Sequence, residues 1–538
     1  MKCPDCNGTL YYDIPKKVLK CRHCGNTYDV AEYDRNNSAE ETIIEGGRLF
    51  TCKNCGAQLI CADDEAVTYC SYCGSEAILE SQMSGIKRPK YIIPFSISKD
   101  RCKEIYEKRL KGSFYIPKEF KDPEFIDRFR PFYIPYWIYK ITFRDDPIDL
   151  KAHKSYTMNG YDYYEEYEIT AKMADNDMVG LPYDASRNFD DSIAEKIAPF
   201  SKKGLVRYSQ GYLAGMYADA PNVDSRTYEE EVLNKATDQA VSEMKLDLRM
   251  DNISLPRRKQ KLQEFLGTTY KGEDTIYLPV WFLTWRKGNR VAYAVVNGQT
   301  GKIHIDLPAD LNVFSEYTAL VAGALFVLLT LFVSVTSRFV IWFAALLVYL
   351  LGIRYHNELK QIRDRENHVF DKGYLLNDEK ELPMSEKKRS RLRKAAERKK
   401  MPFSVVTIAL FMFVFFFFTV FLISGELYDL LVSQTGAIAM TFIVLFLEVI
   451  RFIKQVAVVR YLRNKRSFFI CLLALASVIY AFMVAVGEPV QDWWYYLGAL
   501  ICLFAAMAMS VDLILRYNET STRPLPSFYV RKGGDDRA

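Results

Sequence analysis

The pattern of apolar and polar positions divides the chain near residue 312. Before that point short apolar runs alternate with polar residues, and after it long apolar runs are separated by charged segments. A bilayer-crossing helix takes about 17–25 residues. Six runs qualify: residues 317–336, 339–355, 403–424, 436–453, 468–486 and 493–515. The pattern predicts a six-helix transmembrane region, with a tight hairpin at 315–355 and four further helices within 402–516.

The charge of the loops predicts the orientation of these helices. Residues 354–400 carry fifteen Lys and Arg and residues 451–466 carry six, whereas 425–435 and 487–492 carry none. Loops rich in Lys and Arg stay in the cytoplasm. With six crossings, both termini would be cytoplasmic, as would a basic loop at 356–401 and a tail at 517–538.

The polar part of the chain has the alternation expected of antiparallel strands. Period-two patterns cover residues 137–143, 150–157, 163–173 and 177–183, and a hairpin is expected at 281–285 and 290–296. The motif Tyr133–Trp137 has an echo at Tyr277–Trp281. Each contains a proline, which suits the start of a strand or an edge strand because it lacks an N–H.

Helical patterns interrupt these strands. Residues 99–111 and 190–198 suit short helices. Thr227 and Glu230 have the spacing of a capping box. The helix they would open places Val232, Ala236, Ala240 and Met244 on one face. We expect residues 91–308 to form one cytoplasmic α+β domain with an antiparallel sheet, so the whole chain would be an α+β multidomain membrane protein.

Nine of the twelve cysteines lie before residue 74, and eight of them, all but Cys61, form two copies of one pattern. Each copy has two Cys-x-x-Cys pairs separated by fourteen residues: Cys3, Cys6, Cys21 and Cys24, then Cys52, Cys55, Cys70 and Cys73. Four thiolates at this spacing select zinc in a tetrahedral site. Gly25, Gly56 and Gly74, which follow three of these pairs, are predicted to supply the positive φ that such turns often need. The pattern predicts two zinc ribbons, at residues 1–30 and 48–80, that hold two structural zinc ions. A disulfide framework would need an oxidising compartment, which the predicted orientation disfavours.

Because a four-cysteine site has no open coordination position, its metal would stabilise a fold rather than activate water. The chain contains neither a His-Glu-x-x-His motif nor a Gly-x-Ser-x-Gly motif. We therefore expect a protein that is not an enzyme, and we expect neither catalytic residues nor an organic cofactor.

Charge bears on two further functions. The net charge is only +5, and residues 52–80 carry a single Lys and no Arg, so nucleic acid is not the expected partner. A membrane-tethered nucleic-acid-binding ribbon protein stays an alternative. Glu448 and Asp512 lie within predicted spans but near cytoplasmic helix ends, where they could reach water, Arg451 or Arg516. A transporter, the other alternative, would place charges nearer the middle of the membrane.

Several motifs together resemble those of bacterial membrane proteins described as TFIIB-type zinc-ribbon proteins. The resemblance covers roughly residues 1–310, at Cys70–Ser75, Ile92–Phe95, Tyr115–Phe120, Pro135–Trp137, Tyr212–Gly215, Leu278–Trp281 and Asn297–Lys302. Some members of that family are similar to a membrane component encoded beside phage-shock and flotillin-like proteins. The resemblance implies a protein of the bacterial cell membrane with an anchoring role and such proteins as partners. The six predicted spans, in which this chain departs from that family, would make it a multi-pass protein.

The function that fits these features best is a zinc-binding integral membrane scaffold or adaptor. Its cytoplasmic ribbons and β-rich domain would present docking surfaces to a protein partner, in a role that the family resemblance connects with membrane stress. Membrane lipids are the other expected partner, because residues 386–400 carry nine Lys and Arg that suit anionic headgroups.

Overall fold

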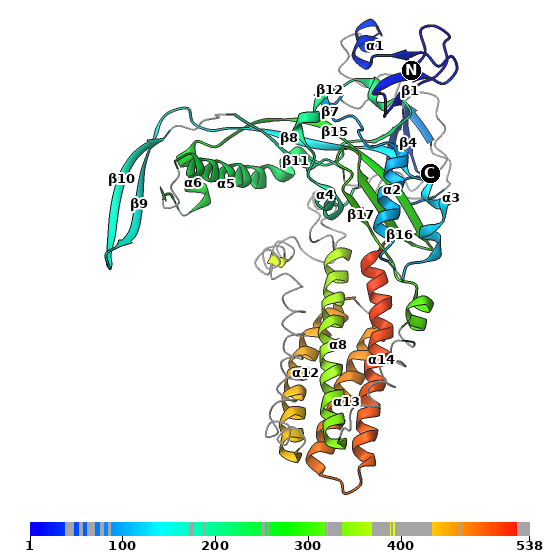
Figure 1. Ribbon diagram of the computed structural model, residues 1–538, viewed down its shortest axis with the longest axis vertical. Coiled ribbons are helices and arrows are strands. Elements are labelled where there is room, and N and C mark those ends of the chain that lie inside the picture. Colours follow the sequence, from blue (N-terminus) through cyan, green and yellow to red (C-terminus); the bar gives the residue numbers. More distant parts are fainter. Residues whose placement is uncertain are drawn as a thin grey trace, which may run out of the picture.

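The computed structural model places a small cysteine-containing unit at one end, a sheet domain with a lateral arm in the middle, and a helix bundle at the other end (Figure 1). The described residues are 1–37, 48–52, 57–61, 70–75, 80–83, 88–113, 115–171, 177–186, 189–248, 253–256, 258–317, 320, 336–367, 369, 388, 391–392, 433–462 and 464–524.

The N-terminal unit is a three-stranded antiparallel sheet in the order β1-β2-β3, followed by one helix. Its elements are β1 (Leu10–Asp13), β2 (Val18–Cys21), β3 (Thr27–Tyr28) and α1 (Val30–Asn37). The Tyr12 N–H donates to the Ala214 carbonyl at 2.9 Å, and the Tyr12 and Tyr212 rings pack edge to face. Leu10 and Leu19 join the same buried core as Leu213. The ribbon therefore shares its core with the sheet domain.

The sheet domain is built on two long antiparallel strands, β8 (Arg130–Thr142) and β15 (Thr269–Lys287). The prediction of a wholly antiparallel sheet is wrong, because two short strands, Tyr217–Asp219 and Tyr91–Ile92, pair in parallel with β8 and β15. The principal strand order is β12-β7-β15-β8-β13-β5-β4-β6, with β11 beside β8 and β16 beside β15, β17 and β18. The bounds are β4 (Arg48–Thr51), β5 (Gln58–Cys61), β6 (Glu80–Met83), β7 (Tyr91–Ile92), β11 (Asp177–Asp184), β12 (Val206–Arg207), β13 (Tyr217–Asp219), β16 (Arg290–Asn297), β17 (Ile303–Ile305) and β18 (Arg523–Pro524).

The two echo motifs face each other across β8 and β15. Pro135 is opposite Tyr277, and Pro279 is opposite Tyr133. The expectation that these prolines start strands or lie in edge strands is wrong, because both lie inside the central pair. Pro135 falls between the residues of β8 that pair with β13 and those that pair with β11. Pro279 likewise falls between the pairings of β15 with β7 and with β16. Because neither of these outer neighbouring strands pairs with the sheet at the breaks, the missing proline N–H does not cost a hydrogen bond between strands.

Helices cover the sheet and its edges. They are α2 (Lys99–Leu110), η1 (Lys118–Lys121), α3 (Pro123–Ile126), α4 (Asp191–Ile197), η2 (Lys202–Gly204), η3 (Gln210–Leu213), η4 (Ser225–Tyr228), α5 (Glu229–Leu248) and α6 (Lys259–Leu266). The helices predicted at 99–111 and 190–198 are α2 and α4. The capping box at Thr227 is wrong: Asp224 caps η4 by accepting from the Arg226 N–H, and Thr227 lies inside that turn, which runs directly into α5.

A long hairpin arm extends sideways from the domain (Figure 1). Its strands are β9 (Ile148–Met158) and β10 (Tyr161–Ala171), and β14 (Ile253–Ser254) pairs with β9. The connecting residues, Asn159 and Gly160, both have positive φ, as a two-residue hairpin turn of type I′ requires. α5 lies along the base of the arm, where Val232, Ala236 and Ala240 are buried as predicted.

The bundle consists of α8 (Ser337–Glu366), α12 (Gln434–Leu462), α13 (Lys465–Gly487) and α14 (Trp493–Ser521). These are the four helices in the described part of the chain that are long and apolar enough to cross a membrane. Four of the six predicted spans are therefore confirmed as such helices. The other two, 317–336 and 403–424, lie largely or wholly outside the described residues, so the predicted count of six is not supported.

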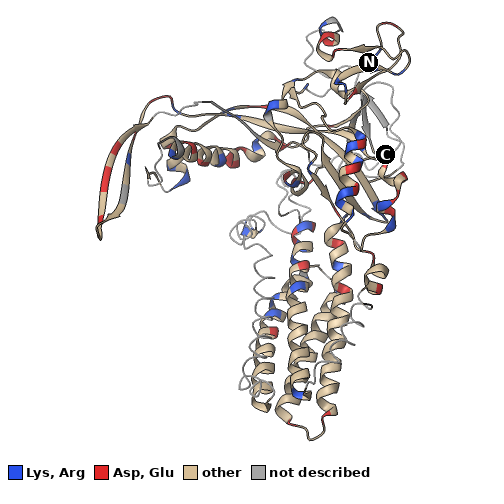
Figure 2. Ribbon diagram, viewed as in Figure 1, with Lys and Arg blue, Asp and Glu red and all other residues tan. Residues whose placement is uncertain are grey.

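The end of α14 fastens the bundle to the sheet domain. Arg290 donates to the carbonyls of Glu519 and Thr522, at 2.5 and 2.9 Å, and Asn518 exchanges two hydrogen bonds with Ala309. β18, which follows α14, pairs with β16. Figure 2 shows that the charged residues of the bundle gather toward the end that meets the sheet domain.

Candidate metal centres

The first four cysteines converge on one point. The Sγ atoms of Cys3, Cys6, Cys21 and Cys24 all lie within 4.8 Å of one another. Cys3 Sγ is 3.7 Å from Cys24 Sγ, and Cys6 Sγ is 3.5 Å from Cys21 Sγ. Zinc–sulfur bonds of about 2.3 Å in a tetrahedron place the sulfurs about 3.8 Å apart. This donor set and its spacing fit a structural zinc ion.

Each Cys-x-x-Cys pair stands on a backbone turn that presents its sulfurs inward. The Cys3 N–H donates to the Gly8 carbonyl, and the Cys21 N–H donates to the Asn26 carbonyl five residues on. Gly25 closes the second turn with φ +78°, as predicted for that position. In the first turn, Asn7 adopts the left-handed conformation at φ 57°, which Asn tolerates better than most residues.

Within the first cluster the pKa is lowered at Cys3 and Cys21 and raised at Cys6 and Cys24, because the four sulfurs share hydrogen bonds with one another. Burial raises the pKa of the Cys3 thiol, but hydrogen bonds with the Tyr28 hydroxyl and the backbone N–H groups of Cys6 and Asp5 outweigh it and lower that pKa to about 6. The Tyr28 hydroxyl lies 3.1 Å from Cys3 Sγ and donates to the Asp5 carboxylate at 2.5 Å. Because zinc binds thiolate rather than thiol, the backbone N–H bonds to Cys3 favour the form of that residue which the ion needs.

The second cluster contains Cys52, Cys70 and Cys73, all buried, with their Sγ atoms within 4.8 Å of one another. Cys52 Sγ is 3.7 Å from Cys73 Sγ. The Cys52 N–H donates to the Ala57 carbonyl and the Cys70 N–H to the Ser75 carbonyl, which repeats the turns of the first cluster. Gly74 has φ +64°, as predicted. The fourth predicted ligand, Cys55, and the predicted turn residue Gly56 lie outside the described residues.

The second cluster is built into the sheet domain. The Tyr293 hydroxyl donates to the Tyr72 carbonyl at 2.7 Å, Thr284 donates to the Ser71 carbonyl, and Arg286 donates to the Cys73 carbonyl at 3.4 Å. β5 pairs with β13, so the hairpin of the second ribbon also continues the large sheet. Sequence reasoning missed this arrangement. The sequence held one indication of it, an aromatic residue, Tyr72, between two of the ligands. In the structure Tyr72 is fully buried against Phe132 and Phe282.

The Tyr72 side chain extends the polar contacts of this cluster into the domain. Its hydroxyl donates to the Asp219 carboxylate at 2.7 Å, and Ser186 donates to the same oxygen. Burial, together with the negative charge of Asp219, raises the pKa of Tyr72 well above its ordinary value. Tyr72 therefore stays protonated and keeps its donor role.

The ionisable residues noted within the spans are buried in the bundle. Glu448 and Asp512 have no exposed surface, so within the described helices they do not reach water, whereas the predicted contacts with Arg451 and Arg516 are confirmed. Glu448 forms two hydrogen bonds with Arg451, while Asp512 lies 3.0 Å from Arg466 and 3.4 Å from Arg516. Both carboxylates are paired with cations, which offsets the cost of burying them.

Comparison with known proteins agrees with the N-terminal geometry. The model of the Trm112p-like protein family matches residues 1–32. Its match covers the first cysteine cluster and ends within α1. The N-terminus of this chain is similar to Trm112p-like proteins.

A longer similarity covers most of a second protein. The chain is 27% identical over 335 residues to a Bacillus subtilis (strain 168) protein named "Uncharacterized protein YdjG", an alignment that spans 61% of this chain and 96% of that protein. No solved structure matches. The cysteine clusters and the apolar helices are those of a membrane-associated zinc-binding protein.

Proposed function

We propose that this protein is an integral membrane adaptor of the bacterial cell membrane that presents two zinc-stabilised ribbons and a β-rich arm to a cytoplasmic protein partner. The observation that carries the proposal is the layout of the molecule: the first ribbon and the hairpin arm both lie away from the bundle, at separate extremities of the sheet domain (Figure 1). The zinc ions would hold the ribbons in shape and would not take part in a reaction.

The position of the basic segments supports a cytoplasmic sheet domain. Arg290 of the domain bonds to the end of α14, and Arg466 at the start of α13 lies beside Asp512 near that same end. The Lys and Arg residues of the bundle thus gather toward the end that meets the domain (Figure 2). By the positive-inside rule, this end faces the cytoplasm.

The two remaining predicted spans, at 317–336 and 403–424, are part of the proposal. The Ser337 hydroxyl donates to the Asp492 carboxylate, and Gln434 donates to the Ala485 carbonyl, so α8 and α12 both begin at the end of the bundle away from the domain. Residues 309–317 and residue 367 lie at the opposite end of the bundle, the end that meets the sheet domain. A span before α8 and another before α12 would make these connections, giving six crossings and cytoplasmic termini.

The arm has the composition of a docking element. Tyr161, Tyr164 and Met158 near its tip are exposed, at 72%, 62% and 51% of their surface. β10 pairs with β9 and with no other strand in the described part of the chain. Exposed tyrosines together with an open strand edge are features that binding surfaces use. Phage-shock and flotillin-like proteins stay the predicted partner class.

Site-directed photo-crosslinking in living cells tests the adaptor. A photoreactive amino acid would replace exposed residues in turn: Lys16 on the first ribbon, Tyr164 on the arm, and Lys121 on η1 as a matched control. We expect protein adducts of defined mass at the first two positions and none at Lys121. The variant Cys3→Ser should lose the ribbon adduct and keep the arm adduct, because only the ribbon depends on that zinc site. Identical adducts at all three positions would contradict the proposal.

A further inference from the structure

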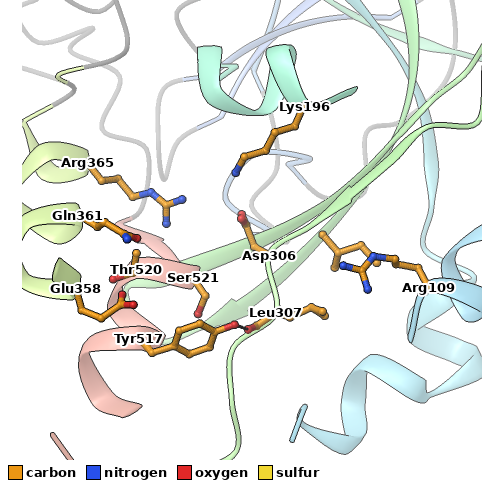
Figure 3. A pocket seen from close by; sticks show the side chains of 11 residues that line it. Arg109, Lys196, Asp306, Leu307, Glu358, Gln361, Arg365, Tyr517, Thr520 and Ser521 are labelled. Atoms are coloured by element: carbon orange, nitrogen blue, oxygen red, sulfur yellow. Dashed lines mark hydrogen bonds between the residues drawn. The ribbon is translucent and has the colours of Figure 1, made fainter. Parts of the chain in front are cut away.

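A cavity lies where the sheet domain meets the bundle. Its volume is about 280 Å³, close to the lower end of the ~300–1,000 Å³ range of ligand sites. Five elements contribute to its walls. The charged residues of the lining are Arg109, Lys196, Asp306, Glu358 and Arg365, and Tyr517 and Thr520 line it from α14. Figure 3 shows the ends of Lys196 and Arg365 pointing from opposite sides into the space above Asp306.

Three cations and two carboxylates line the cavity, and the carboxylate of Glu358 has an oxygen without a hydrogen-bond partner among the described residues, so three cations face one available carboxylate. Within the described part of the chain, neither Arg109, Lys196 nor Arg365 has a carboxylate within ion-pair distance. Asp306 is already engaged: it accepts from the Tyr293 N–H, contacts His304 at 3.2 Å and lies 3.7 Å from Arg523.

The cations also repel one another. Partial burial is the largest effect that lowers the pKa of Lys196; Asp306 and Asp190 oppose it, and the positive charges of Arg523 and Arg365 add to it. An anion bound between Lys196 and Arg365 would relieve this repulsion. Arg forms paired hydrogen bonds with phosphate oxygens, and Lys adds a point charge.

The level of the cavity along the bundle identifies the source of the anion. The apolar run of α14 ends at Leu515, and Tyr517 and Thr520 follow it by about 3 and 8 Å along the axis. Glu358 is about 5 Å beyond Tyr355 at the corresponding end of α8. Because the headgroup layer is about 5–8 Å thick on each side of the hydrocarbon core, the membrane-side wall of the cavity lies at headgroup depth.

We propose that this cavity binds the phosphate-bearing headgroup of an anionic glycerophospholipid from the cytoplasmic leaflet. Lys196 and Arg365 would hold the phosphate, Arg109 would add long-range attraction, and Glu358 would accept from headgroup hydroxyls. The inference rests on the membrane insertion and orientation proposed above, but not on docking of a protein partner. A bound lipid would tie α4, α8 and the end of α14 together and so set the domain against the membrane.

The test uses the full-length protein in a neutral, phosphate-free detergent. Titration calorimetry would compare dihexanoyl phosphatidylglycerol, dihexanoyl phosphatidylcholine and inorganic phosphate. The pocket variant carries Lys196→Gln and Arg365→Gln. The control variant carries Lys261→Gln and Arg258→Gln, which removes the same two charges from exposed positions on and beside α6. Zinc content and elution volume show whether each variant is folded, and Lys196→Gln alone carries the test if the double variant is not.

We expect phosphatidylglycerol to bind the wild type at least tenfold more tightly than phosphatidylcholine or phosphate. The pocket variant should lose at least tenfold in affinity for it, and the control less than twofold. Equal affinity of wild type and pocket variant would overturn the site. Inorganic phosphate binding as tightly as the lipid would overturn its lipid identity, and so would phosphatidylcholine. The lipid titration needs no protein partner, so its result can be interpreted even if the adaptor proposal fails.

Discussion

The Tyr72 hydroxyl donates a 2.7 Å hydrogen bond to the Asp219 carboxylate. The two residues are 147 positions apart: Tyr72 lies between two cysteines of the second cluster, and Asp219 ends β13. Both are fully buried. This bond joins a metal-binding turn to the central sheet, so the stability of the cluster and that of the sheet domain are coupled.

Replacing Tyr72 by Phe should therefore destabilise the sheet domain without removing zinc. Ser186 would still donate to the Asp219 carboxylate. Loss of a buried bond to a charged acceptor costs about 1.5–3 kcal/mol. Thermal unfolding of the full-length protein in detergent would measure the loss. Tyr161→Phe on the exposed arm is the matched control and should unfold like the wild type. A Tyr72→Phe protein as stable as the wild type would contradict the coupling.

Local patterns in the sequence predicted local structure well. The alternation of apolar and polar residues predicted β8 to β11 and the β15–β16 hairpin. The helical spacing of apolar residues predicted α2 and the buried face of α5. Cysteine spacing identified the first cluster completely, because a metal site of this kind needs only short-range geometry. These features depend on neighbours within about twenty residues, which one sequence displays directly.

Long-range packing is what the sequence did not display. Pairing of β5 with β13 joins residues about 160 positions apart, and no periodicity marks such a contact. The prolines of β8 and β15 lie in central strands, although proline is expected at strand starts and in edge strands. Each lies at a break between two neighbouring strands, and such breaks exist only in the assembled sheet. The cavity at the bundle junction draws Arg109, Lys196 and Arg365 from three distant segments, so their proximity also appears only in three dimensions.

Zinc analysis by mass spectrometry should find two ions per chain. Cys3→Ser should lose one ion and Cys70→Ser the other. Cys55→Ser should behave like Cys70→Ser, which tests the predicted ligand that lies outside the described residues. His23→Ala, an exposed change between two ligands of the first cluster, should retain both ions. Two ions retained in Cys55→Ser would remove that residue from the ligand set.

Accessibility of single cysteines should report the orientation of the bundle. Gln491→Cys, in the turn between α13 and α14, should react with a membrane-impermeant thiol reagent on intact cells. Ser254→Cys, exposed on β14, should react only after lysis. The wild type, with its native thiols, provides the background. Labelling of Ser254→Cys without lysis would invert the proposed topology, and with it the cytoplasmic setting of the cysteine clusters.

Close packing around Arg451 should make the bundle sensitive at Gly352. A methyl group added to Gly352 would overlap the Arg451 guanidinium, which is held in place by Glu448 and Gln455. Overpacking of this kind costs about 1–3 kcal/mol, so Gly352→Ala should unfold at lower temperature in detergent. Gly487→Ala, where an added methyl meets no atom within 4 Å, is the control. Equal melting of both variants would show that Arg451 is free to move.

The attachment of β18 to the sheet domain should weaken in acid. Arg523 lies 3.4 Å from Asp190 and 3.7 Å from Asp306. Burial raises the pKa of Asp190, but the charge of Arg523 and hydrogen bonds with Ser192 outweigh it and lower that pKa to about 2. The pKa of Asp306 is lowered in the same way. Burial raises it, but the charge of Arg523 and the hydrogen bond with His304 outweigh burial.

The sign of the pH dependence follows from these directions. A carboxyl whose folded pKa lies below its unfolded value of about 3.9 contributes stability above that pH and loses it as the pH falls through the folded pKa. Arg523→Gln should therefore lower the free energy of unfolding by about 1–2 kcal/mol near neutral pH. The difference from the wild type should shrink between about pH 4 and pH 2. Melting temperatures of both proteins at several pH values, with Arg258→Gln as an exposed control, measure it. A difference that stays constant down to pH 2 would show that Arg523 acts through packing, such as its contact with the Tyr293 ring, and not through its charge.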